Sequence, residues 1–145
     1  MPASPSELIA SDHTLSQTSM HDSDCLFCAL PPERLVLQND LAFAILDGFP
    51  VTEGHALVIP KRHVVDYFGL TGDELSACDD LLRQLRADTM SKDTTVQGFN
   101  VGMNAGLVAG QTIFHCHIHL IPRRAGDVEN PRGGVRHIIP GKGYY

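Results

Sequence analysis

HCHIHLIPRR, residues 115–124, places His115, His117 and His119 at alternate positions. Successive side chains of an extended strand point to opposite faces, so the pattern predicts three imidazoles on one face and the intervening apolar residues against the core. A rise of about 3.3 Å per residue would set His115 and His119 roughly 13 Å apart, near the limit for sharing one metal ion. The stretch therefore indicates a strand whose histidines divide a structural task from a task at a substrate.

Length, charge and cysteine content limit the kind of protein this is. A chain of 145 residues fits one domain that can bury a core without disulfides. The net charge of -6 argues against long nucleic acid as a partner. We find no secretory signal and no run near the roughly 20 apolar residues of a membrane span. We therefore expect a cytoplasmic protein with no membrane partner, whose four cysteines stay reduced or hold a metal.

The N-terminal part of the chain differs in composition from the rest. Residues 1–22 are rich in Ser and Thr, contain Pro2 and Pro5, and show no sustained hydrophobic period. Such segments cannot bury enough apolar surface to offset the entropy of ordering. We predict a disordered tail over residues 1–22 and a single domain over residues 23–145.

Alternation between turn residues and β-rich runs predicts five strands, at 34–39, 41–46, 55–60, 98–104 and 113–122. Thr71 and Glu74 form a capping-box pattern ahead of leucines at helical spacing, which predicts a helix over 70–90. The C-terminal tail is too rich in Gly and Pro for a regular element, although its residues 135–139 could add a short edge strand or lie across a neighbouring element.

CLFC, residues 25–28, is a Cys-x2-Cys pair that can bind zinc from one tight turn. A redox-active dithiol is the alternative, but that motif needs a thioredoxin-like βαβ context, which the strand pattern does not supply. Zinc needs two further ligands. Five of the eight histidines are candidates, at positions 55, 63, 115, 117 and 119.

These motifs together resemble the histidine triad (HIT) family of nucleotide hydrolases and transferases. HCHIHLI (115–121) fits His-x-His-x-His followed by two apolar residues, and GHALVIPKRH (54–63) and NAGLVAGQTIFH (104–115) stand in the family's order and spacing. The resemblance implies an α+β fold: a five-stranded antiparallel sheet, one long helix and a short N-terminal helical turn. It also implies a homodimer.

The resemblance implies that His117 is the catalytic nucleophile. It would attack the α-phosphorus of an adenosine nucleotide conjugate and form a covalent nucleotidyl-histidine. The conjugate would be a dinucleoside polyphosphate, a phosphoramidate or an aminoacyl adenylate. The tautomer of His117 would be fixed by the main-chain carbonyl of His55, while the side chains of His55 and His119 would contact the phosphate and assist proton delivery.

Other positions carry over from the resemblance by the group that each would contact. Asp47 corresponds to an acidic residue that binds ribose hydroxyls; the phosphate contacts would be Asn104, Gln111 and Thr112; the apolar base pocket would be Leu26, Phe27, Ile45 and Leu46. The zinc-containing bacterial-type members imply a structural Zn2+ bound by Cys25, Cys28, His63 and His115. The family often has a bulky residue where Gly48 stands, so the base pocket is expected to be thinner on that side.

Two other functions are compatible with the motifs. A nucleotide-binding or partner-docking module would keep the pocket with little catalysis, and tight nucleotide binding without turnover would identify it. A metal-dependent oxygenase or cupin-like protein would use the His-x-His pair around an open metal site. Loss of activity on chelation, restored at once by added metal, would identify that second class.

Overall fold

The computed structural model describes residues 24–145; the predicted tail and Ser23, with which the predicted domain begins, lie outside the described residues. The described part contains a five-stranded antiparallel sheet with strand order β1-β2-β3-β5-β4. The strands are β1 (Leu35–Gln38), β2 (Ala42–Leu46), β3 (Ala56–Pro60), β4 (Val96–Gly102) and β5 (Ile118–Arg124). One long helix, α2 (Gly72–Lys92), lies between β3 and β4 in the chain. The predicted α+β fold is confirmed.

Short helical turns connect these elements. Near the start of the described residues, the Ala29 N–H donates to the Cys25 carbonyl at 3.2 Å, which closes the predicted N-terminal helical turn. Four 3-10 helices follow: η1 (Pro32–Arg34), η2 (Tyr67–Gly69), η3 (Leu107–Ala109) and η4 (Gly134–Ile138). No helix within residues 24–145 is both long and apolar enough to cross a membrane.

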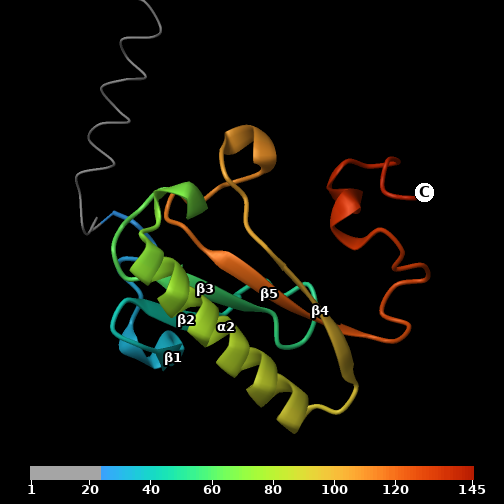
Figure 1. The fold of residues 1–145 in the computed structure, drawn as a ribbon, viewed down its shortest axis with the longest axis horizontal. Coiled ribbons are helices and arrows are strands. Elements are labelled where there is room, and N and C mark those ends of the chain that lie inside the picture. The colour runs from blue at the N-terminus through green and yellow to red at the C-terminus, as the bar shows by residue number, and fades with distance from the viewer. Residues whose placement is uncertain (1–23) are drawn as a thin grey trace, which may run out of the picture.

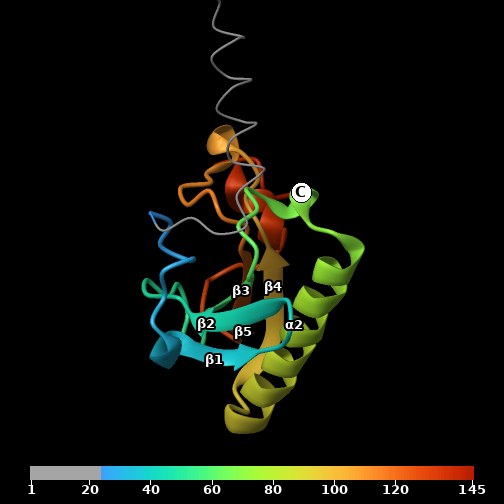
Figure 2. The same cartoon turned by 90° about the vertical axis from the view of Figure 1, so that its left-hand side faces the viewer.

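Helix α2 covers one face of the sheet (Figures 1 and 2). Ala42, Ala44 and Ala56 on the central strands are at most 2% exposed, and their small side chains let Leu81 and Leu85 of the helix pack close to the sheet. Truncating a buried leucine such as Leu81 to alanine typically costs about 2–5 kcal/mol. The opposite face carries a second cluster, built from β2, β3 and Phe27 with Leu35 of β1 packed against it, which leaves β4 and β5 accessible on that side.

The start of α2 is tied to the end of β3. The Thr71 side chain accepts from the Glu74 N–H and the Glu74 side chain accepts from the Thr71 N–H, as the capping-box pattern predicts. Glu74 is only 4% exposed and also accepts two hydrogen bonds from Arg62, at 2.7 and 3.0 Å. Arg62 is therefore committed to this structural pair.

Two sequence predictions are wrong in detail. The predicted strand over 113–122 begins only at Ile118, because the Cys116 N–H donates to the Val64 carbonyl at 2.7 Å and this part of the chain lies outside the β ladder. Of the two arrangements expected for residues 135–139, the edge strand is wrong: most of them belong to η4, whose first residue, Gly134, lies near Asn100 of β4. The first segment is positioned by its contact with the distant Val64, and the second mainly by contacts within residues 130–145.

Candidate active site and metal cluster

The histidines do not form one row. His115, in the loop before β5, is fully buried and packs its ring against His63, with centroids 4.9 Å apart. His117 and His119 remain neighbours, with ring centroids 5.3 Å apart, and His55 at the start of β3 packs against His119 at 5.1 Å. The loop therefore separates one imidazole from the other three.

His115 joins the predicted metal ligands. The donor atoms of Cys25, Cys28, His63 and His115 all lie within 4.8 Å of one another. Three sulfur-to-Nδ1 distances are 3.4, 3.4 and 3.5 Å. A tetrahedral zinc ion with Zn–S of about 2.3 Å and Zn–N of about 2.1 Å would set sulfur and nitrogen about 3.6 Å apart. The cluster therefore has both the ligand types and the spacing of a structural zinc site.

The orientation of the His115 ring supports metal binding. Its Nε2–H donates to the Pro60 carbonyl at 2.8 Å, so the Nδ1 lone pair is directed into the cluster. A backbone carbonyl behind a ligating imidazole is the usual arrangement, because it fixes the tautomer and makes the ligand more basic. Sequence reasoning could not find the Pro60 carbonyl, because no side chain marks it.

His117 is also held in one tautomer. Its Nδ1 lies 2.8 Å from the carbonyl oxygen of His115, so Nδ1 carries the proton and Nε2 is left with a lone pair. The predicted acceptor, the His55 carbonyl, is wrong: that carbonyl accepts from the Asp47 N–H at 2.9 Å. The reason is the bend ahead of Ile118, which turns the His115 carbonyl toward the ring of His117.

His55 has the opposite tautomer. The backbone N–H of Val51 donates to its Nδ1 at 3.1 Å, so the proton of the neutral ring is on Nε2. That Nε2 lies 2.9 Å from Nδ1 of His119 and 3.4 Å from Oδ2 of Asp47. His119 accepts at Nδ1 and therefore presents Nε2–H as a donor.

Burial keeps this pair uncharged near pH 7. Desolvation is the largest cause that lowers the pKa of His119, to about 4, and nearby His117 and His55 lower it further. Desolvation also lowers the pKa of His55, against the attraction of Asp47. The donor atoms of Asp47, His55 and His119 are close enough to hold a metal. However, the proton on His55 Nε2 occupies the position that an ion would need.

Of the predicted ribose and base residues, Phe27 contacts His117 and Asp47 lies beside His55. Asp47, at the end of β2, accepts from the Phe49 N–H at 2.8 Å and its side chain is 16% exposed. Phe27 is buried, with its ring 5.1 Å from the His117 ring in an edge-to-face contact. Ile45 is buried as well, whereas Leu26 and Leu46 are exposed. A Cβ added at Gly48 would meet no atom within 4 Å, so no neighbouring residue fills the space that a bulkier side chain would take at this position.

Gln111 braces the loop that carries the first two histidines. Its side chain is buried, donates to the carbonyls of Val65 at 2.6 Å and Ile113 at 3.2 Å, and accepts from the Gly106 N–H at 2.9 Å. These bonds use its amide in the loop, and a phosphate contact from Gln111 stays a prediction. Thr112 is exposed, and Asn104 is exposed beside the cavity described next.

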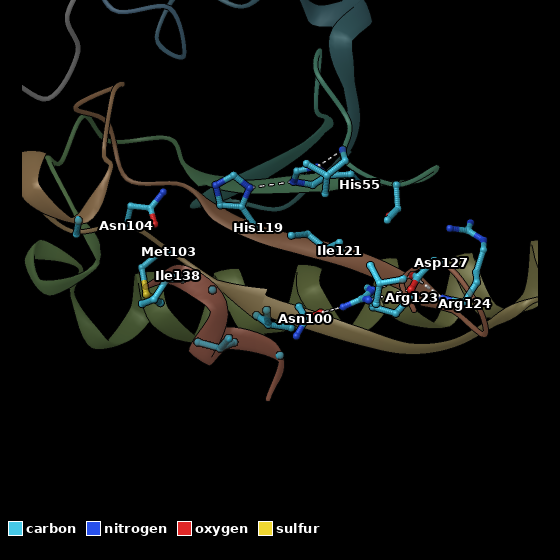
Figure 3. A pocket seen from close by; sticks show the side chains of 18 of the residues that line it. His55, Asn100, Met103, Asn104, His119, Ile121, Arg123, Arg124, Asp127 and Ile138 are labelled. Atoms are coloured by element: carbon cyan, nitrogen blue, oxygen red, sulfur yellow. Dashed lines mark hydrogen bonds and ion pairs between the residues drawn. The ribbon is translucent and has the colours of Figure 1, made fainter. Parts of the chain in front are cut away.

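A cavity of about 960 Å³ opens along β4 and β5 next to His55 and His119 (Figure 3). Asn104, Arg123 and Arg124 are among its lining residues, and part of the C-terminal segment lines it too. We expected contacts to the leaving group from the C-terminal tail, but the sequence did not indicate which of its residues would reach the site. The only signal available was its three large apolar residues, Val135, Ile138 and Ile139, in a segment otherwise rich in Gly and charged residues.

Known proteins match most of this chain. The family model described as HIT domain matches residues 31–126. Adenylylsulfatase HINT3 of Arabidopsis thaliana is 34% identical over 77% of this chain and 58% of its own length. Adenosine 5'-monophosphoramidase HNT1 of Saccharomyces cerevisiae is 33% identical over 76% of this chain and 69% of its own length. A zinc-bound histidine triad family protein from Mycobacterium smegmatis superposes with a TM-score of 0.67 at 32% identity, covering 74% of this chain and 80% of its own.

Proposed function

Because the chain belongs to the HIT family, we propose that it hydrolyses adenosine nucleotide conjugates at the α-phosphorus through a covalent intermediate on His117. The observation that carries the proposal is the hydrogen bond of 2.8 Å from His117 Nδ1 to the His115 carbonyl. That bond leaves Nε2 unprotonated, as a nucleophile requires, and the acceptor stabilises the positive charge that the ring gains on attack.

The reaction has two displacements at the same phosphorus. In the first, the Nε2 lone pair of His117 forms a P–N bond while the bond to the leaving group breaks, and the leaving group departs with the electron pair. In the second, the oxygen of a water molecule forms a P–O bond and the P–N bond breaks. Water supplies the hydroxyl of the nucleoside monophosphate and the proton that balances the leaving group. His117 returns to its starting form.

The neighbouring histidines assist as neutral groups in this proposal. His119 presents Nε2–H toward the cavity, where it can donate to a phosphate oxygen as negative charge builds up. His55 orients His119 through its own Nε2–H. Asp47 would bind ribose hydroxyls, and Phe27, Ile45, Leu26 and Leu46 would contact the base. Asn104, Thr112 and Gln111 are the proposed polar groups around the phosphates.

Two relatives with enzyme names support an AMP conjugate as the substrate. One is named an adenylylsulfatase and the other an adenosine 5'-monophosphoramidase. Phosphoramidates, aminoacyl adenylates and dinucleoside polyphosphates all carry an α-phosphorus bonded to a nucleoside oxygen and to a leaving group. The proposed chemistry therefore applies to each of them, and the leaving group decides among them.

We propose that Cys25, Cys28, His63 and His115 bind a structural zinc ion. Four protein ligands would fill a tetrahedral coordination sphere, so the ion would tie the N-terminal segment to the loop before β5. The zinc-bound relative supports this assignment. Reduced cysteines at such a site fit a reducing compartment, which supports the cytoplasm as the location.

We also propose a homodimer. Strand β4 is an edge of the sheet in the described residues, and Val101 on it is 49% exposed. An open strand edge with an apolar residue favours association. Light scattering of the purified protein measures the mass: twice the chain mass supports the dimer and a single chain mass contradicts it.

Trapping the intermediate tests the main proposal. Wild-type enzyme quenched in alkaline denaturant, where the P–N bond survives, during turnover of adenosine 5'-phosphoramidate should carry an added AMP on the peptide that contains His117, as measured by mass spectrometry. His117→Asn should lose the adduct and more than about 1,000-fold in kcat, with an unchanged circular dichroism spectrum. An adduct on another residue would contradict the mechanism. Wild-type enzyme that binds AMP tightly without turning over any conjugate would be a binding module instead.

A further inference from the structure

We propose that Thr52 is a positioning residue: its hydroxyl fixes residues 51–55 against β5, and through them the orientation of His55 and His119. Residues 51–55 are called the 51–55 turn below. The proposal rests on the proposed function and adds to it a residue that acts through His55. It follows from the hydrogen bonds that connect Thr52 to these two histidines.

The orientation of His55 depends on one backbone group of the 51–55 turn. The Val51 N–H donates to Nδ1 of His55 at 3.1 Å, so the neutral ring carries its proton on Nε2. That Nε2 lies 2.9 Å from Nδ1 of His119, and a dashed line joins the two rings in Figure 3. If the Val51 N–H moved away, the proton of His55 could shift to Nδ1, and Nε2 would then have no proton to donate to His119.

Burial does not hold the Val51 N–H in place. Residues 48–51 are all exposed, and Phe49 and Val51 are 92% and 69% exposed. A segment that has no side chain in the core opens locally at a small cost in free energy. The direction of the Val51 N–H therefore depends on the hydrogen bonds at the two ends of this segment.

The first end is held at the base of the connection between β2 and β3. The Asp47 N–H donates to the His55 carbonyl at 2.9 Å, and the Asp47 side chain accepts from the Phe49 N–H at 2.8 Å. These bonds stop two residues before Val51, so they do not fix the direction of its N–H. The second end has to supply that constraint.

Thr52 holds the second end. Its hydroxyl donates to the Pro122 carbonyl at 2.8 Å, and its own carbonyl accepts from the His55 N–H at 3.1 Å. Pro122 is fully buried in β5, so the hydroxyl joins the turn to a well-packed part of the sheet. Because Thr52 directly follows Val51, fixing Thr52 also sets the position of the Val51 backbone.

The rest of the 51–55 turn also lies against β5. Gly54 has a φ of +88°, which glycine adopts without strain, and a Cβ there would approach Cγ of Pro122 to 3.3 Å. Arg124 donates to the Glu53 carbonyl at 2.9 Å. These contacts should keep the turn on the sheet when the Thr52 hydroxyl is removed, so that its loss releases mainly the backbone of Val51.

Removing the hydroxyl tests the proposal. Thr52→Val keeps the shape of the side chain without the donor, and Thr52→Ser keeps the donor. Thr52→Val should lower kcat for adenosine 5'-phosphoramidate about 10- to 100-fold with little change in KM, because a slightly misplaced group costs this much in the transition state. Thr52→Ser should recover most of the lost kcat.

Ser91→Ala is the matched control. The Ser91 hydroxyl also donates to a backbone carbonyl, that of Asp88 at 2.9 Å, but it lies near the end of α2. Its removal should leave kcat unchanged. Thr52 is half-buried and belongs to neither core cluster, so we expect Thr52→Val to fold, and circular dichroism checks this.

The tautomer of His55 gives a second readout that needs no turnover. Heteronuclear NMR of the histidine rings distinguishes a protonated from an unprotonated ring nitrogen. At neutral pH, His55 should carry its proton on Nε2 alone in wild-type protein and in Thr52→Ser. In Thr52→Val we expect a second population with the proton on Nδ1. A general loss of stability would not produce this change in a folded protein.

Contrary results separate the two proposals. If His55 keeps a single tautomer in Thr52→Val, the role of Thr52 is overturned whether or not kcat falls, and His117 catalysis still stands. A kcat in Thr52→Ser as low as in Thr52→Val would also overturn it. If wild-type enzyme turns over no conjugate, the proposed function is wrong; a changed His55 tautomer in Thr52→Val then supports the link from Thr52 to His55, and an unchanged one overturns it.

Discussion

Nε2 of His55 lies 2.9 Å from Nδ1 of His119, and the other ring nitrogen of His55 accepts from the Val51 N–H. A backbone N–H cannot change its role, so His55 keeps its proton on Nε2. A proton added to Nδ1 of His119 would then face the N–H of His55. The geometry and the burial therefore act together to keep His119 neutral, in agreement with its pKa of about 4.

This arrangement predicts a pH-dependent loss of stability. The pKa of His119 rises from about 4 in the native state to about 6.5 on unfolding, so the unfolded chain binds more protons between these values. The free energy of unfolding should fall as the pH drops from 6.5 toward 4. His119→Gln should lack the part of this decrease in unfolding free energy that comes from protonation of His119. Urea unfolding of zinc-loaded wild-type protein and His119→Gln from pH 4 to 8 measures the difference. Identical pH profiles of the two proteins would contradict an uncharged His55–His119 pair.

A second prediction concerns the loop before the histidines. Gln111→Glu replaces the side-chain NH2 group, which donates to the carbonyls of Val65 and Ile113, with a carboxylate oxygen. That oxygen repels both carbonyl oxygens. We expect a loss of at least about 2 kcal/mol in the free energy of unfolding, because buried acceptors lose their donor. Gln97→Glu makes the same chemical change at an exposed position and should have little effect. Equal stability of the two variants would show that the brace is unimportant.

The sequence predicted the elements whose signals are local. Thr71 and Glu74 lie three residues apart and mark the start of α2 within a residue or two of the predicted helix. The four predicted zinc ligands were grouped by resemblance, and the structure brings their side chains together. Residue type and spacing carried this information, because the chemistry depends on the side chains themselves.

The loop before β5 could not be predicted in the same way. Alternating His and apolar residues fit a strand whether or not their backbone pairs with a neighbouring strand. Here the pairing starts only at Ile118, because the Cys116 N–H bonds to the Val64 carbonyl instead. The acceptor for His117 likewise depends on a bend that no side chain encodes. The place of Ile138 beside the cavity follows from contacts among residues 130–145 and from packing near Asn100, which a linear pattern does not reveal.

A third prediction concerns the link between β3 and α2. Glu74→Gln keeps the size of the side chain but removes the charge that pairs with Arg62 and weakens the capping box. The expected loss is about 1–3 kcal/mol by thermal or urea unfolding. Asp79→Asn breaks an exposed pair with Arg83 on the same helix and is the control, with no measurable change expected. If the two variants lose the same amount of unfolding free energy, the buried Glu74–Arg62 pair contributes no more to stability than the exposed one.

The pairing of Glu74 also has a pH signature. Its hydrogen bonds with Arg62 are the largest cause that lowers its pKa below the ordinary 4.5. The pair is therefore fully stabilising above about 4.5, and its contribution is lost as the pH falls through the lower native pKa. The stability of wild-type protein and Glu74→Gln should converge as the pH falls below 4.5, and a constant difference would contradict the assignment.

The last prediction concerns the proposed zinc ligands. Cys28→Ser removes one of two sulfurs, so the variant should retain far less than one zinc per chain by elemental analysis, and its thermal unfolding should shift to lower temperature. Cys78→Ala is the control: burial raises the pKa of Cys78 to about 11, so this thiol stays protonated in the core and should not affect zinc content. Chelation of wild-type protein should lower its unfolding temperature as Cys28→Ser does. A wild-type protein that purifies without zinc and is indifferent to chelator would show that the cluster is only a set of packed side chains.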